Sequence, residues 1–354
     1  MPLSPAPSPP SLLAIAARVE ERLRQLLDGE IARWQDVDAS LAEPLASLQR
    51  LVEAGGKRLR PAFCYWAFVG AGGEPDDPRI VDAGAAFEML HAFALIHDDV
   101  MDGADTRRGA PATHAEFSAR HRRDGWRGEG RRFGEGVAIL VGDLAHVYAD
   151  QLLGEPPSGA AALWHELRLE LIVGQYLDLL GTARGDRDPA TARRIARYKS
   201  GKYTIERPLH VGAALAGGNE ALLAALSAYG DPLGEAFQLR DDVLGAFGDP
   251  ATTGKPVGPD LREGKPTPLL AVACDRATGG QLAALDRVGD PGLSDEEVRG
   301  IQQVLVDTGA LQAIEDEIER LTARAVEALG AAPIGAGAGR ELVALAHFVA
   351  TRES

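Results

Sequence analysis

Apolar side chains recur every three or four residues along most of this chain of 354 residues. Leu12, Ile15, Val19 and Leu23 show the pattern, which places apolar side chains on one face of a helix. The same spacing returns in residues 80–102, 137–153, 161–180, 192–215, 221–247, 296–306 and 311–329. Alternation of apolar and polar residues, which would indicate strands, is nearly absent; its one candidate, residues 137–141, lies inside a longer helical pattern. The chain is therefore predicted to be an all-α protein of ten or more helices.

Glycine- and proline-rich segments separate the predicted helices, and the longest loops are expected at 122–136 and 249–268. None has the composition of a flexible linker between independent cores, and the chain has no internal repeat. We therefore predict a single domain over residues 11–354, preceded by a disordered Pro/Ser-rich tail at residues 1–10.

The composition excludes several classes of protein. Lys+Arg 37 against Asp+Glu 52 gives a net charge of −15, whereas a nucleic-acid-binding protein needs a basic surface. The six arginines between residues 120 and 132 are interpreted as a solvated loop. Cys64 and Cys274 are too few and too far apart for a disulfide framework or a zinc site. No apolar run reaches the roughly 18 residues that span a bilayer, and the N-terminal tail lacks the basic region of a signal peptide. We expect a soluble cytoplasmic protein that has no membrane span and binds no nucleic acid.

Two acidic motifs carry the first chemical signal. Asp98, Asp99 and Asp102 close an apolar stretch at spacing i, i+1 and i+4, which puts Asp98 and Asp102 one turn apart on one helix face. Oxygen ligands at this spacing suit Mg²⁺, an ion that keeps several waters and bridges to phosphates. Taken alone, the motif also fits an acidic helix end capped by solvent. A second pair, Asp241 and Asp242, ends another apolar helix, and the two motifs together predict two facing metal sites in a helical bundle.

Fixed cations accompany the acidic motifs. A diphosphate held by aspartate-bound Mg²⁺ has further oxygens, which arginine and lysine bind well. The basic residues fall into separate sets, which predict two diphosphates. They are Lys57, Arg58 and Arg60 in a glycine-rich loop, Arg107 and Arg108 after the first acidic motif, and Lys202, Lys255 and Lys265 beside glycines.

The ordered motifs resemble those of the trans-isoprenyl diphosphate synthases, the polyprenyl synthetase family, most closely the geranylgeranyl and farnesyl diphosphate synthases. The segments that carry the resemblance are 55–61, 88–91, 98–102, 106–109, 142–143, 202–204, 237–242 and 254–265, within roughly residues 45–270. The resemblance implies the isoprenoid synthase fold, a single-domain helical bundle around a deep central cavity, assembled as a homodimer. It also implies an enzyme, with several Mg²⁺ ions per active site, that condenses isopentenyl diphosphate head-to-tail with an allylic diphosphate.

Matching positions give the motif residues the roles that the resemblance implies. The metal ligands would be Asp98, Asp102 and Asp241, supported by Asp99 and Asp242. The allylic diphosphate would be held by Arg107, Lys202 and Lys255, with Lys265 as a further candidate. Isopentenyl diphosphate would be held by Gly56, Lys57, Arg60, His91 and Arg108. Thr204 and Gln238 would form a polar pair near the reacting carbons.

Three positions depart from the pattern of the family. Gly245 stands where many members carry a third aspartate, so one supporting ligand is missing. Pro259 precedes Asp260 where a second acidic residue is common, and Pro266 follows Lys265 where a basic residue is common. The departures concern the allylic side of the site and leave the paired aspartates in place.

The length of the product is predicted from the helix that carries Asp98. Phe93 and Ala94 precede Asp98 by five and four residues, about one helical turn. In the resembled family, an aromatic residue followed by a small one goes with products of intermediate length. We therefore predict the C20 product, geranylgeranyl diphosphate, over the C15 product, farnesyl diphosphate. Met89 and Leu90, one turn deeper, are the next candidates for the floor, and Phe93 packed in a helix interface is the alternative.

Other activities fit parts of the sequence. A class I terpene cyclase shares the fold and an aspartate motif but needs no site for isopentenyl diphosphate. A non-catalytic subunit of a heteromeric synthase typically loses an aspartate motif, whereas the first one is intact in this chain. An HD-type phosphohydrolase, suggested by His97 and Asp98, leaves the second aspartate pair and the paired arginines without a role. The prenyltransferase is therefore the preferred interpretation.

Overall fold

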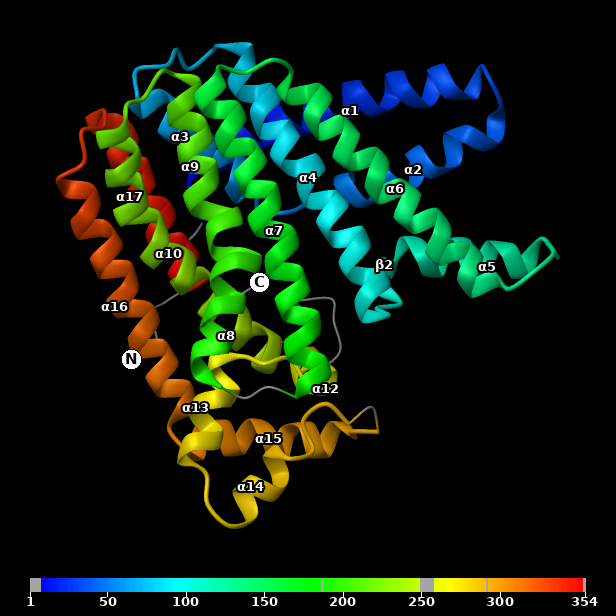
Figure 1. The fold of residues 1–354 in the computed structure, drawn as a ribbon, viewed down its shortest axis with the longest axis vertical. Coiled ribbons are helices and arrows are strands. Elements are labelled where there is room, and N and C mark those ends of the chain that lie inside the picture. Colours follow the sequence, from blue (N-terminus) through cyan, green and yellow to red (C-terminus); the bar gives the residue numbers. More distant parts are fainter. Residues whose placement is uncertain (1–7, 186–187, 249–257, 291, 353–354) are drawn as a thin grey trace. The chain divides into compact units, whose positions relative to one another are not determined.

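Helices make up almost all of the computed structural model, which describes residues 8–185, 188–248, 258–290 and 292–352 (Figure 1). The prediction of an all-α protein is confirmed. The chain packs as two compact units: an N-terminal unit of Pro10–Tyr65 with Glu74–Pro156, and a C-terminal unit chiefly of Trp66–Gly73 with Pro157–Ser354. That the two units form one domain stays a prediction.

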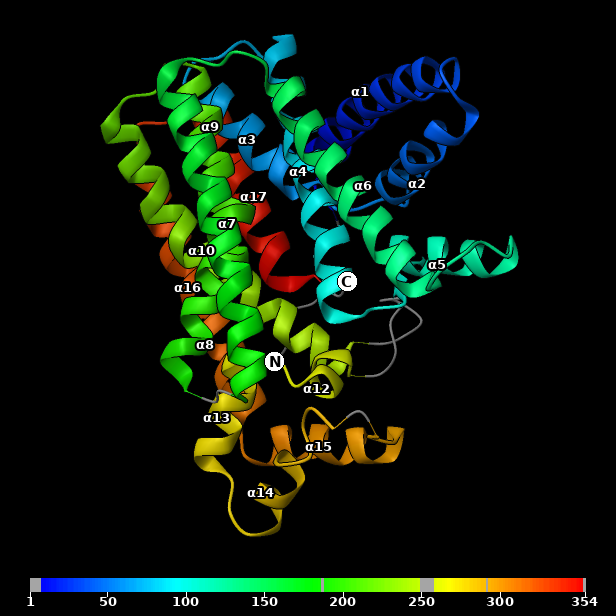
Figure 2. The same cartoon turned by 45° about the vertical axis from the view of Figure 1, so that its right-hand side comes forward.

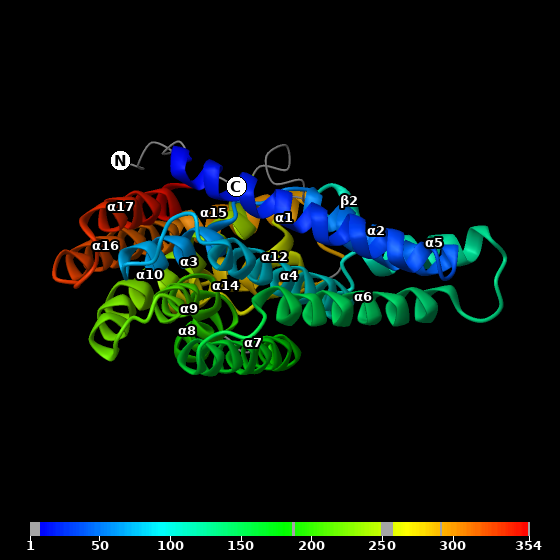
Figure 3. The same cartoon turned by 90° about the horizontal axis from the view of Figure 1, so that it is seen from above.

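The N-terminal unit contains α1 (Pro10–Gln35), a 3₁₀ turn η1 (Ala39–Leu41), α2 (Ala42–Glu53), the first part of α3 (Leu59–Gly70), α4 (Pro78–Asp102), β1 (Thr106–Arg107), β2 (Ala110–Pro111), α5 (Thr113–Arg123) and α6 (Gly130–Leu153). Helix α4 packs along α6, and α1 and α2 also contact it (Figures 2 and 3). Because α4 is covered by several neighbours, most of its apolar side chains are buried.

Local signals in the sequence determine both ends of α4. The Asp77 side chain accepts a hydrogen bond from the Arg79 backbone N–H, and Pro78 occupies the first helical position. Gly103 follows the helix in the left-handed conformation, with φ of 64°, which glycine adopts without strain. Helix α4 therefore ends at Asp102, and the first acidic motif occupies its last turn.

Strands β1 and β2 form a two-stranded antiparallel hairpin in which Arg107 lies opposite Ala110. The turn residues Arg108 and Gly109 both have positive φ, 53° and 75°. Positive φ at both positions lets a two-residue turn follow the twist of its strands. The sequence pattern did not predict this hairpin, because strands of two residues are too short to show an alternation.

The C-terminal unit contains the rest of α3 and α7 (Ser158–Arg184), α8 (Pro189–Ala196), a π-helical segment η2 (Arg197–Glu206), α9 (Arg207–Leu215), α10 (Glu220–Phe247), α12 (Pro259–Glu263), α13 (Pro268–Arg276), α14 (Gly280–Leu285), α15 (Asp295–Asp307), α16 (Ala310–Gly330) and α17 (Ala336–Thr351). Helix α10 is central to this unit, because α16, α17 and η2 all pack against it (Figure 1).

The stretch 192–215, predicted as one continuous helix, changes to π-helical geometry in its middle. Two glycines on neighbouring helices bring the backbones close to this segment. A Cβ on Gly174 of α7 would lie 2.4 Å from the η2 backbone, and a Cβ on Gly234 of α10 would lie 2.8 Å from the Gly201 carbonyl oxygen. π-helical turns are rare and occur frequently at functional sites, and Lys202 lies in this one.

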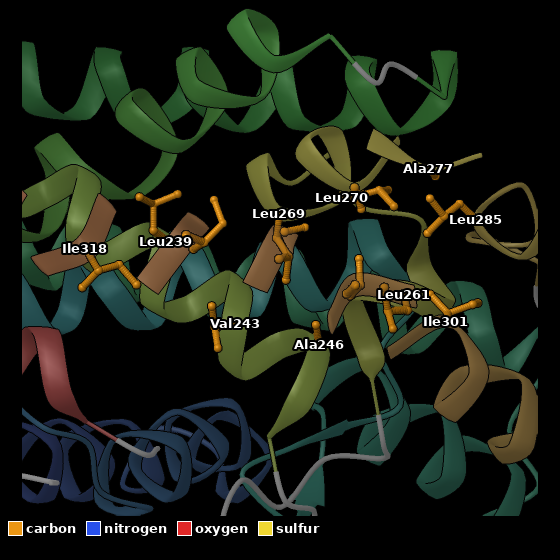
Figure 4. Packing of buried hydrophobic residues seen from close by; sticks show 14 of the residues in the cluster. Leu239, Val243, Ala246, Leu261, Leu269, Leu270, Ala277, Leu285, Ile301 and Ile318 are labelled. Atoms are coloured by element: carbon orange, nitrogen blue, oxygen red, sulfur yellow. The ribbon is translucent and has the colours of Figure 1, made fainter. Parts of the chain in front are cut away.

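A cluster of buried apolar side chains holds α10 and the helices from α12 to α16 together (Figure 4). Leu239 and Val243 contribute from α10, Leu270 from α13 and Ile301 from α15. Leu261 belongs to the same cluster, so it anchors α12, a helix of only five residues, into the core. The position of α12 therefore depends on this core rather than on its own helical hydrogen bonds.

Helix α6 begins at Gly130, so residues 130–136, which were expected in a loop, are helical. Glycine in this segment serves close packing instead of breaking the helix. A Cβ on Gly134 would lie 2.2 Å from the His114 carbonyl oxygen of α5. The composition signal for a loop was therefore wrong at these residues.

Two helices, α4 and α6, are long and apolar enough to cross a membrane by length and composition. The expectation that no stretch reaches this threshold is therefore wrong by this criterion. For α4, 61% of the apolar window is buried inside the structure, as in the core helix of a soluble protein; for α6 the share is 39%. Length and composition alone are weak evidence for a membrane span.

Candidate active site

The first acidic motif lies beside the hairpin that carries Arg107. The Arg107 Nε donates to Asp99 Oδ1 at 2.8 Å, and a second guanidinium nitrogen of Arg107 donates to the same oxygen. This second nitrogen lies 3.8 Å from Asp98 Oδ2. Burial raises the pKa of Asp99, as does the charge of Asp98, although the hydrogen bond from Arg107 opposes both. Asp98 and Asp102 are only partly buried. Asp99 is therefore buried and hydrogen-bonded to Arg107, whereas Asp98 and Asp102 lie nearer to solvent.

His91, which lies on α4, has a pKa that is lowered by burial and by the charges of four arginines. Burial holds the pKa of His91 well below its ordinary value, and the charges of Arg60, Arg108, Arg107 and Arg58 lower it further. The imidazole is therefore neutral at neutral pH and lies within a concentration of positive charge. Such a group of donors suits an anion with several oxygens. Arg60, His91 and Arg108, three of the residues assigned to isopentenyl diphosphate, are thus close enough for their charges to interact.

The glycine-rich loop before α3 approaches Arg108 closely. Arg108 donates to the carbonyl oxygen of Leu51 at 3.2 Å and to that of Gly55. A Cβ on Gly56 would lie 3.2 Å from an Arg108 guanidinium nitrogen, so the bare glycine leaves room for this side chain. Lys57, in the same loop, is partly exposed. The loop, α3, α4 and the hairpin turn thus all contribute residues to this part of the N-terminal unit.

Arg58, in contrast, is engaged in an internal ion pair. It donates to Glu88 at 2.5 Å, to Glu20 at 3.0 Å and to the Val52 carbonyl oxygen at 2.6 Å. Arg58 and Glu88 are both buried, and Arg58 adopts a φ of 50°, which residues other than glycine rarely do. Arg58 therefore holds the glycine-rich loop in place.

Replacing Arg58 with methionine is expected to lower the free energy of unfolding by about 3–5 kcal/mol, because the buried Glu88 loses its partner. The double variant Arg58→Met/Glu88→Leu should recover most of this loss, since it leaves no uncompensated buried charge. Urea unfolding followed by circular dichroism measures both effects. Equal stabilities of the wild type and Arg58→Met would contradict this assignment.

The second acidic pair lies near the C-terminal end of α10. Gln238 Nε2 donates to Asp242 Oδ1 at 2.8 Å. Burial raises the pKa of Asp242 well above its ordinary value, and the charges of Asp260 and Asp241 raise it further, against the hydrogen bond from Gln238. Within the described part of the chain, Gln238 Oε1 and Asp242 Oδ2 are buried and have no hydrogen-bond partner. Buried polar atoms without a partner are rare and mark a place where water or an ion belongs.

Arg352, directly after α17, binds Asp241. Its guanidinium donates to Asp241 Oδ1 at 2.5 Å and to the Phe237 carbonyl oxygen at 3.1 Å, and its central carbon lies 4.0 Å from the centre of the Phe237 ring. Each acidic motif therefore has an arginine on one of its carboxylates, Arg107 on Asp99 and Arg352 on Asp241. Arg352 stands in no sequence motif, so its contact with Asp241 could not be predicted from the sequence.

Lys202 is held by acidic side chains of the C-terminal unit. Its Nζ lies 2.6 Å from Glu170 Oε1 of α7 and 3.7 Å from Glu206 Oε2. Arg207 donates to both carboxylate oxygens of Glu170, at 2.6 and 2.7 Å. Burial alone would raise the pKa of Glu170, but the hydrogen bonds from Arg207 and Lys202 outweigh it, so the pKa is lowered. Thr204 is completely buried, with 0% exposed. Glu170 and Arg207 stand in none of the sequence motifs and lie on α7 and α9, so their contacts depend on the packing of helices and could not be predicted from spacing.

Lys265 follows α12 and contacts two acidic side chains. Its Nζ lies 2.7 Å from Glu263 Oε2 and 3.8 Å from Asp260 Oδ1. Lys255, to which the resemblance gives a contact with the allylic diphosphate, lies outside the described residues, so its role stays a prediction.

The aspartates of the two acidic motifs offer only oxygen atoms as ligands for a metal ion. No group of three or more His, Cys, Asp or Glu side chains in the described parts of the chain is already placed to hold a metal ion. Mg²⁺ is commonly bound by one or two carboxylates together with water and substrate phosphates. The pairs Asp98 with Asp102 and Asp241 with Asp242, and the unpaired Asp242 Oδ2, therefore fit Mg²⁺ bound with a diphosphate.

Phe93 lies in a group of rings on the face of α4 that meets α6. Its ring centre is 4.7 Å from that of His97 and 4.9 Å from that of His146. Helix α6 approaches closely at Gly142, where a Cβ would lie 2.3 Å from the His97 ring. Ala94, the neighbouring residue on α4, is partly exposed. Phe93 is therefore fixed by ring contacts on one side.

Comparisons with known proteins add independent evidence. The family model "Polyprenyl synthetase" matches residues 43–305. The chain is 34% identical over 304 residues to a geranylfarnesyl diphosphate synthase of Aeropyrum pernix, covering 83% of this chain and 89% of that protein. It is also 34% identical over 333 residues to a geranylgeranyl diphosphate synthase of Mycobacterium tuberculosis, covering 89% and 88%.

A solved structure extends the similarity to the fold. The crystal structure of geranylgeranyl pyrophosphate synthase from Corynebacterium glutamicum, complexed with isoprenyl diphosphate and magnesium, matches with a TM-score of 0.90 and 38% identity. The match covers 96% of this chain and 99% of that chain. The chain therefore belongs to the polyprenyl synthetase family and is an enzyme of the trans-prenyltransferase type.

Proposed function

We propose that this enzyme condenses isopentenyl diphosphate head-to-tail with an allylic diphosphate, depends on Mg²⁺, and releases geranylgeranyl diphosphate as its main product. We expect it to work as a soluble cytoplasmic protein. The observation that carries the proposal is the arginine group around the neutral His91, within the same unit as the oxygen-only acidic end of α4. The arginine group suits a diphosphate that is bound directly by cationic side chains. The acidic end of α4 suits a diphosphate that is bound through metal ions.

In this proposal, the direct site binds isopentenyl diphosphate. Arg60 and Arg108 donate charged hydrogen bonds to its diphosphate, and the neutral His91 adds a ring N–H. Lys57 and the backbone at Gly56 complete the contacts from the glycine-rich loop. Binding by the diphosphate alone leaves the double bond of isopentenyl diphosphate free to attack, in an orientation that the site fixes.

The aspartates bind the allylic diphosphate through metal ions. Asp98, Asp102 and Asp241 are the proposed ligands, and Asp99 and Asp242 support them. Mg²⁺, when bound, neutralises charge on the departing diphosphate and so favours ionisation to the allylic cation.

Cationic side chains stabilise the same departing diphosphate. We assign this role to Arg107, Lys202 and Lys255, with Lys265 as a further contact, and place Thr204 and Gln238 beside the reacting carbons. The released diphosphate then accepts the proton that is lost after the new carbon–carbon bond forms. Apolar surroundings protect the cation from water.

The direct test is incubation of the purified protein with labelled isopentenyl diphosphate and one allylic partner at a time, with Mg²⁺ present. Label should enter longer prenyl diphosphates, and a chelator should abolish the incorporation. Formation of a cyclic hydrocarbon would instead indicate a terpene cyclase. Release of inorganic phosphate alone would indicate a phosphohydrolase. A protein that turns over only after a second chain is added would be a non-catalytic subunit.

The cation group argues against the terpene cyclase, which takes no isopentenyl diphosphate. Arg60, His91 and Arg108 would have no ligand in such an enzyme. The intact first acidic motif likewise argues against the non-catalytic subunit. The C20 product is supported by Phe93 and Ala94, whereas the C15 product would be expected with a second bulky residue at this level.

Exchanges at Phe93 and Ala94 should change the product length. Phe93→Ala is expected to lengthen the main product beyond C20, because it removes the ring that closes the tail space. Ala94→Phe should shorten it to C15, and Phe133→Ala, an exposed aromatic residue of α6, should leave it at C20. Chromatography of the dephosphorylated products measures all three. Wild-type products from both Phe93→Ala and Ala94→Phe would move the floor to another level, where the buried Met89 and Leu90 are the candidates.

Homodimer formation is the further part of this proposal, and it is supported by an exposed apolar stripe on α7. Leu169, Ile172, Val173 and Tyr176 follow helical spacing and each expose more than half of their surface. Ile172→Glu should lower the molar mass in light scattering from that of a dimer to that of one chain. The control Leu13→Glu, at a similarly exposed leucine of α1, should leave the mass unchanged. A dimeric Ile172→Glu protein would exclude this stripe as the interface.

A further inference from the structure

The arginine-rich segment, which was expected to be a solvated loop, lies mostly on helices. Three of its six arginines belong to the last turn of α5, two belong to the first turn of α6, and Arg127 lies in the loop between them. This loop projects at one end of the N-terminal unit (Figures 2 and 3). The two helix ends and the loop, residues 120–133, are called the α5–α6 tip below. The proposed condensation gives this tip no role.

Half of the arginines in the α5–α6 tip are paired with carboxylates. Arg120 and Arg123 each have a guanidinium nitrogen close to Asp124, at 3.3 and 2.9 Å, and Arg131 lies 2.7 Å from Glu135. The other three arginines are exposed and form no ion pair with any residue that the structure describes; they are Arg122, Arg127 and Arg132. These three positive charges are therefore available to an anionic partner.

The charge of the α5–α6 tip is opposite to that of the whole chain. The chain carries a net charge of −15, whereas the tip contains six arginines and only two acidic residues, Asp124 and Glu129. An anionic surface is attracted by the tip and repelled by the excess of negative charge elsewhere. The charge distribution therefore favours approach of such a surface at this end of the N-terminal unit.

Two aromatic side chains are exposed among these arginines. Trp126 exposes 42% of its surface and Phe133 exposes 36%. Their ring centres lie 5.2 Å apart in an edge-to-face arrangement, and both rings contact the buried His121, at 6.0 and 5.4 Å. The Arg120 guanidinium lies 5.3 Å from the centre of the Trp126 ring. The Trp126 ring is therefore held at the surface by its neighbours.

Exposed rings beside unpaired arginines match the chemistry of an anionic bilayer surface. Tryptophan is enriched where lipid headgroups meet the acyl chains, because its ring is apolar and its N–H needs a polar partner. Arginine forms charged hydrogen bonds with lipid phosphates. An acidic peptide would account for the arginines but would leave the rings of Trp126 and Phe133 in water. The rings therefore favour a lipid surface over an acidic protein.

We propose that the α5–α6 tip binds the surface of a membrane that contains anionic lipids. The three unpaired arginines contact the lipid phosphates, and Trp126 lies at the boundary with the acyl chains. The contact is peripheral and reversible, since few side chains contribute to it. It goes beyond the proposed condensation, and it places an enzyme with an apolar prenyl product beside a phase that dissolves such a product.

The first experiment is co-sedimentation of the purified full chain with vesicles. The wild type should bind vesicles of phosphatidylglycerol and phosphatidylcholine and should not bind vesicles of phosphatidylcholine alone. The variant without the unpaired charges should bind the anionic vesicles roughly 100-fold more weakly, since each basic residue near an anionic surface contributes roughly fivefold. This variant is Arg122→Gln/Arg127→Gln/Arg132→Gln.

A matched control removes three charges from other exposed positions, on α15, α16 and α17. It is Arg299→Gln/Arg324→Gln/Arg340→Gln, and it should bind the anionic vesicles at least as well as the wild type does. Equal loss of binding in the two triple variants, or equal binding of the wild type to both kinds of vesicle, would overturn the proposal. Binding of polyglutamate without binding of anionic vesicles would also overturn it, in favour of an acidic protein partner.

Salt and turnover complete this experiment. Raising the ionic strength from 0.1 M to 1 M shortens the Debye length from about 10 Å to about 3 Å and should release the protein from the vesicles. Both triple variants should keep the circular dichroism and the turnover of the wild type, because none of their arginines belongs to the proposed diphosphate sites. Vesicle binding is measured without substrate, so its outcome is independent of whether the proposed reaction is correct.

The second experiment places Trp126 relative to the bilayer. Anionic vesicles with brominated acyl chains should quench part of the tryptophan fluorescence of the wild type. Trp126→Phe keeps a ring against Phe133 and should lose this quenching, because Trp34 and Trp66 are only partly exposed and Trp164 is buried. Equal quenching of the wild type and Trp126→Phe would place the bilayer contact elsewhere and contradict the role of the α5–α6 tip.

Discussion

Asp98→Ala and Asp102→Ala are each expected to lower kcat by roughly 10²–10³-fold, the size of effect seen when one group that stabilises developing charge is removed. Both carboxylates lie on the last turn of α4 and are partly exposed, whereas Asp99 between them is bound by Arg107. Loss of either one removes an oxygen ligand of the proposed ions, so the departing diphosphate keeps more of its charge. Steady-state assays at increasing Mg²⁺ measure the loss and show whether more metal compensates for it.

The same two exchanges should not destabilise the fold. Asp98 and Asp102 repel each other at one turn's distance, so removing one relieves like-charge repulsion. Urea midpoints at or above that of the wild type are therefore expected. Asp105→Asn, an exposed carboxylate that follows α4, is the control and should keep full turnover. Near-normal turnover of Asp98→Ala or Asp102→Ala at ordinary Mg²⁺ would remove these residues from the metal site.

Exchanges at Arg60, His91 and Lys202 should act on different substrates. Arg60→Ala and His91→Ala are expected to raise KM for isopentenyl diphosphate by roughly 10- to 100-fold, because a hydrogen bond to a charged group contributes about 1.5–3 kcal/mol. Their effect on KM for the allylic partner should be small. Lys202→Ala should mainly lower kcat or raise KM for the allylic partner, since its charge counts most when the diphosphate leaves.

The environment of each residue explains the expected separation. Arg60 lies with His91 in the arginine group of the N-terminal unit, whereas Lys202 is held by Glu170 in the C-terminal unit. Arg50→Gln, at an exposed arginine paired with Glu116, should alter neither KM. Equal effects of the three exchanges on both substrates would contradict two distinct diphosphate sites.

Features that depend on neighbouring residues in the chain could be predicted from the sequence. The helical spacing of apolar residues predicted the all-α fold, and the acidic motif was correctly expected at the end of α4. Both succeed because a helix is built from contacts within one or two turns, so spacing, Asp77 before the helix and Gly103 after it are sufficient signals. The charges of Arg60 and Arg108 both act on His91, but that these three side chains bind one diphosphate stays a prediction from the resemblance.

Glycine is the residue whose structural role was predicted least well from the sequence. In residues 130–136 it was read as a loop signal, although Gly134 lies inside α6 and permits contact with α5. Gly174 and Gly234 likewise allow the backbones of α7 and α10 to lie close to the π-helical segment η2, which was predicted as part of one continuous helix. The local signal of glycine is the same in a turn and in a close helix contact, so only the partner surface distinguishes the two.

By itself, the sequence determined the helices, the oxygen-only acidic motifs and the family, because these depend on residue type and short spacing. The tertiary structure alone decided which charges meet. Arg352 reaches Asp241 across 111 residues. Arg58, one of three cations in the same loop, is turned inward to Glu88 while Arg60 joins the group around His91. Such pairings follow from the packing of distant helices, whose relative position is determined by a shared apolar core and not by any spacing along the chain.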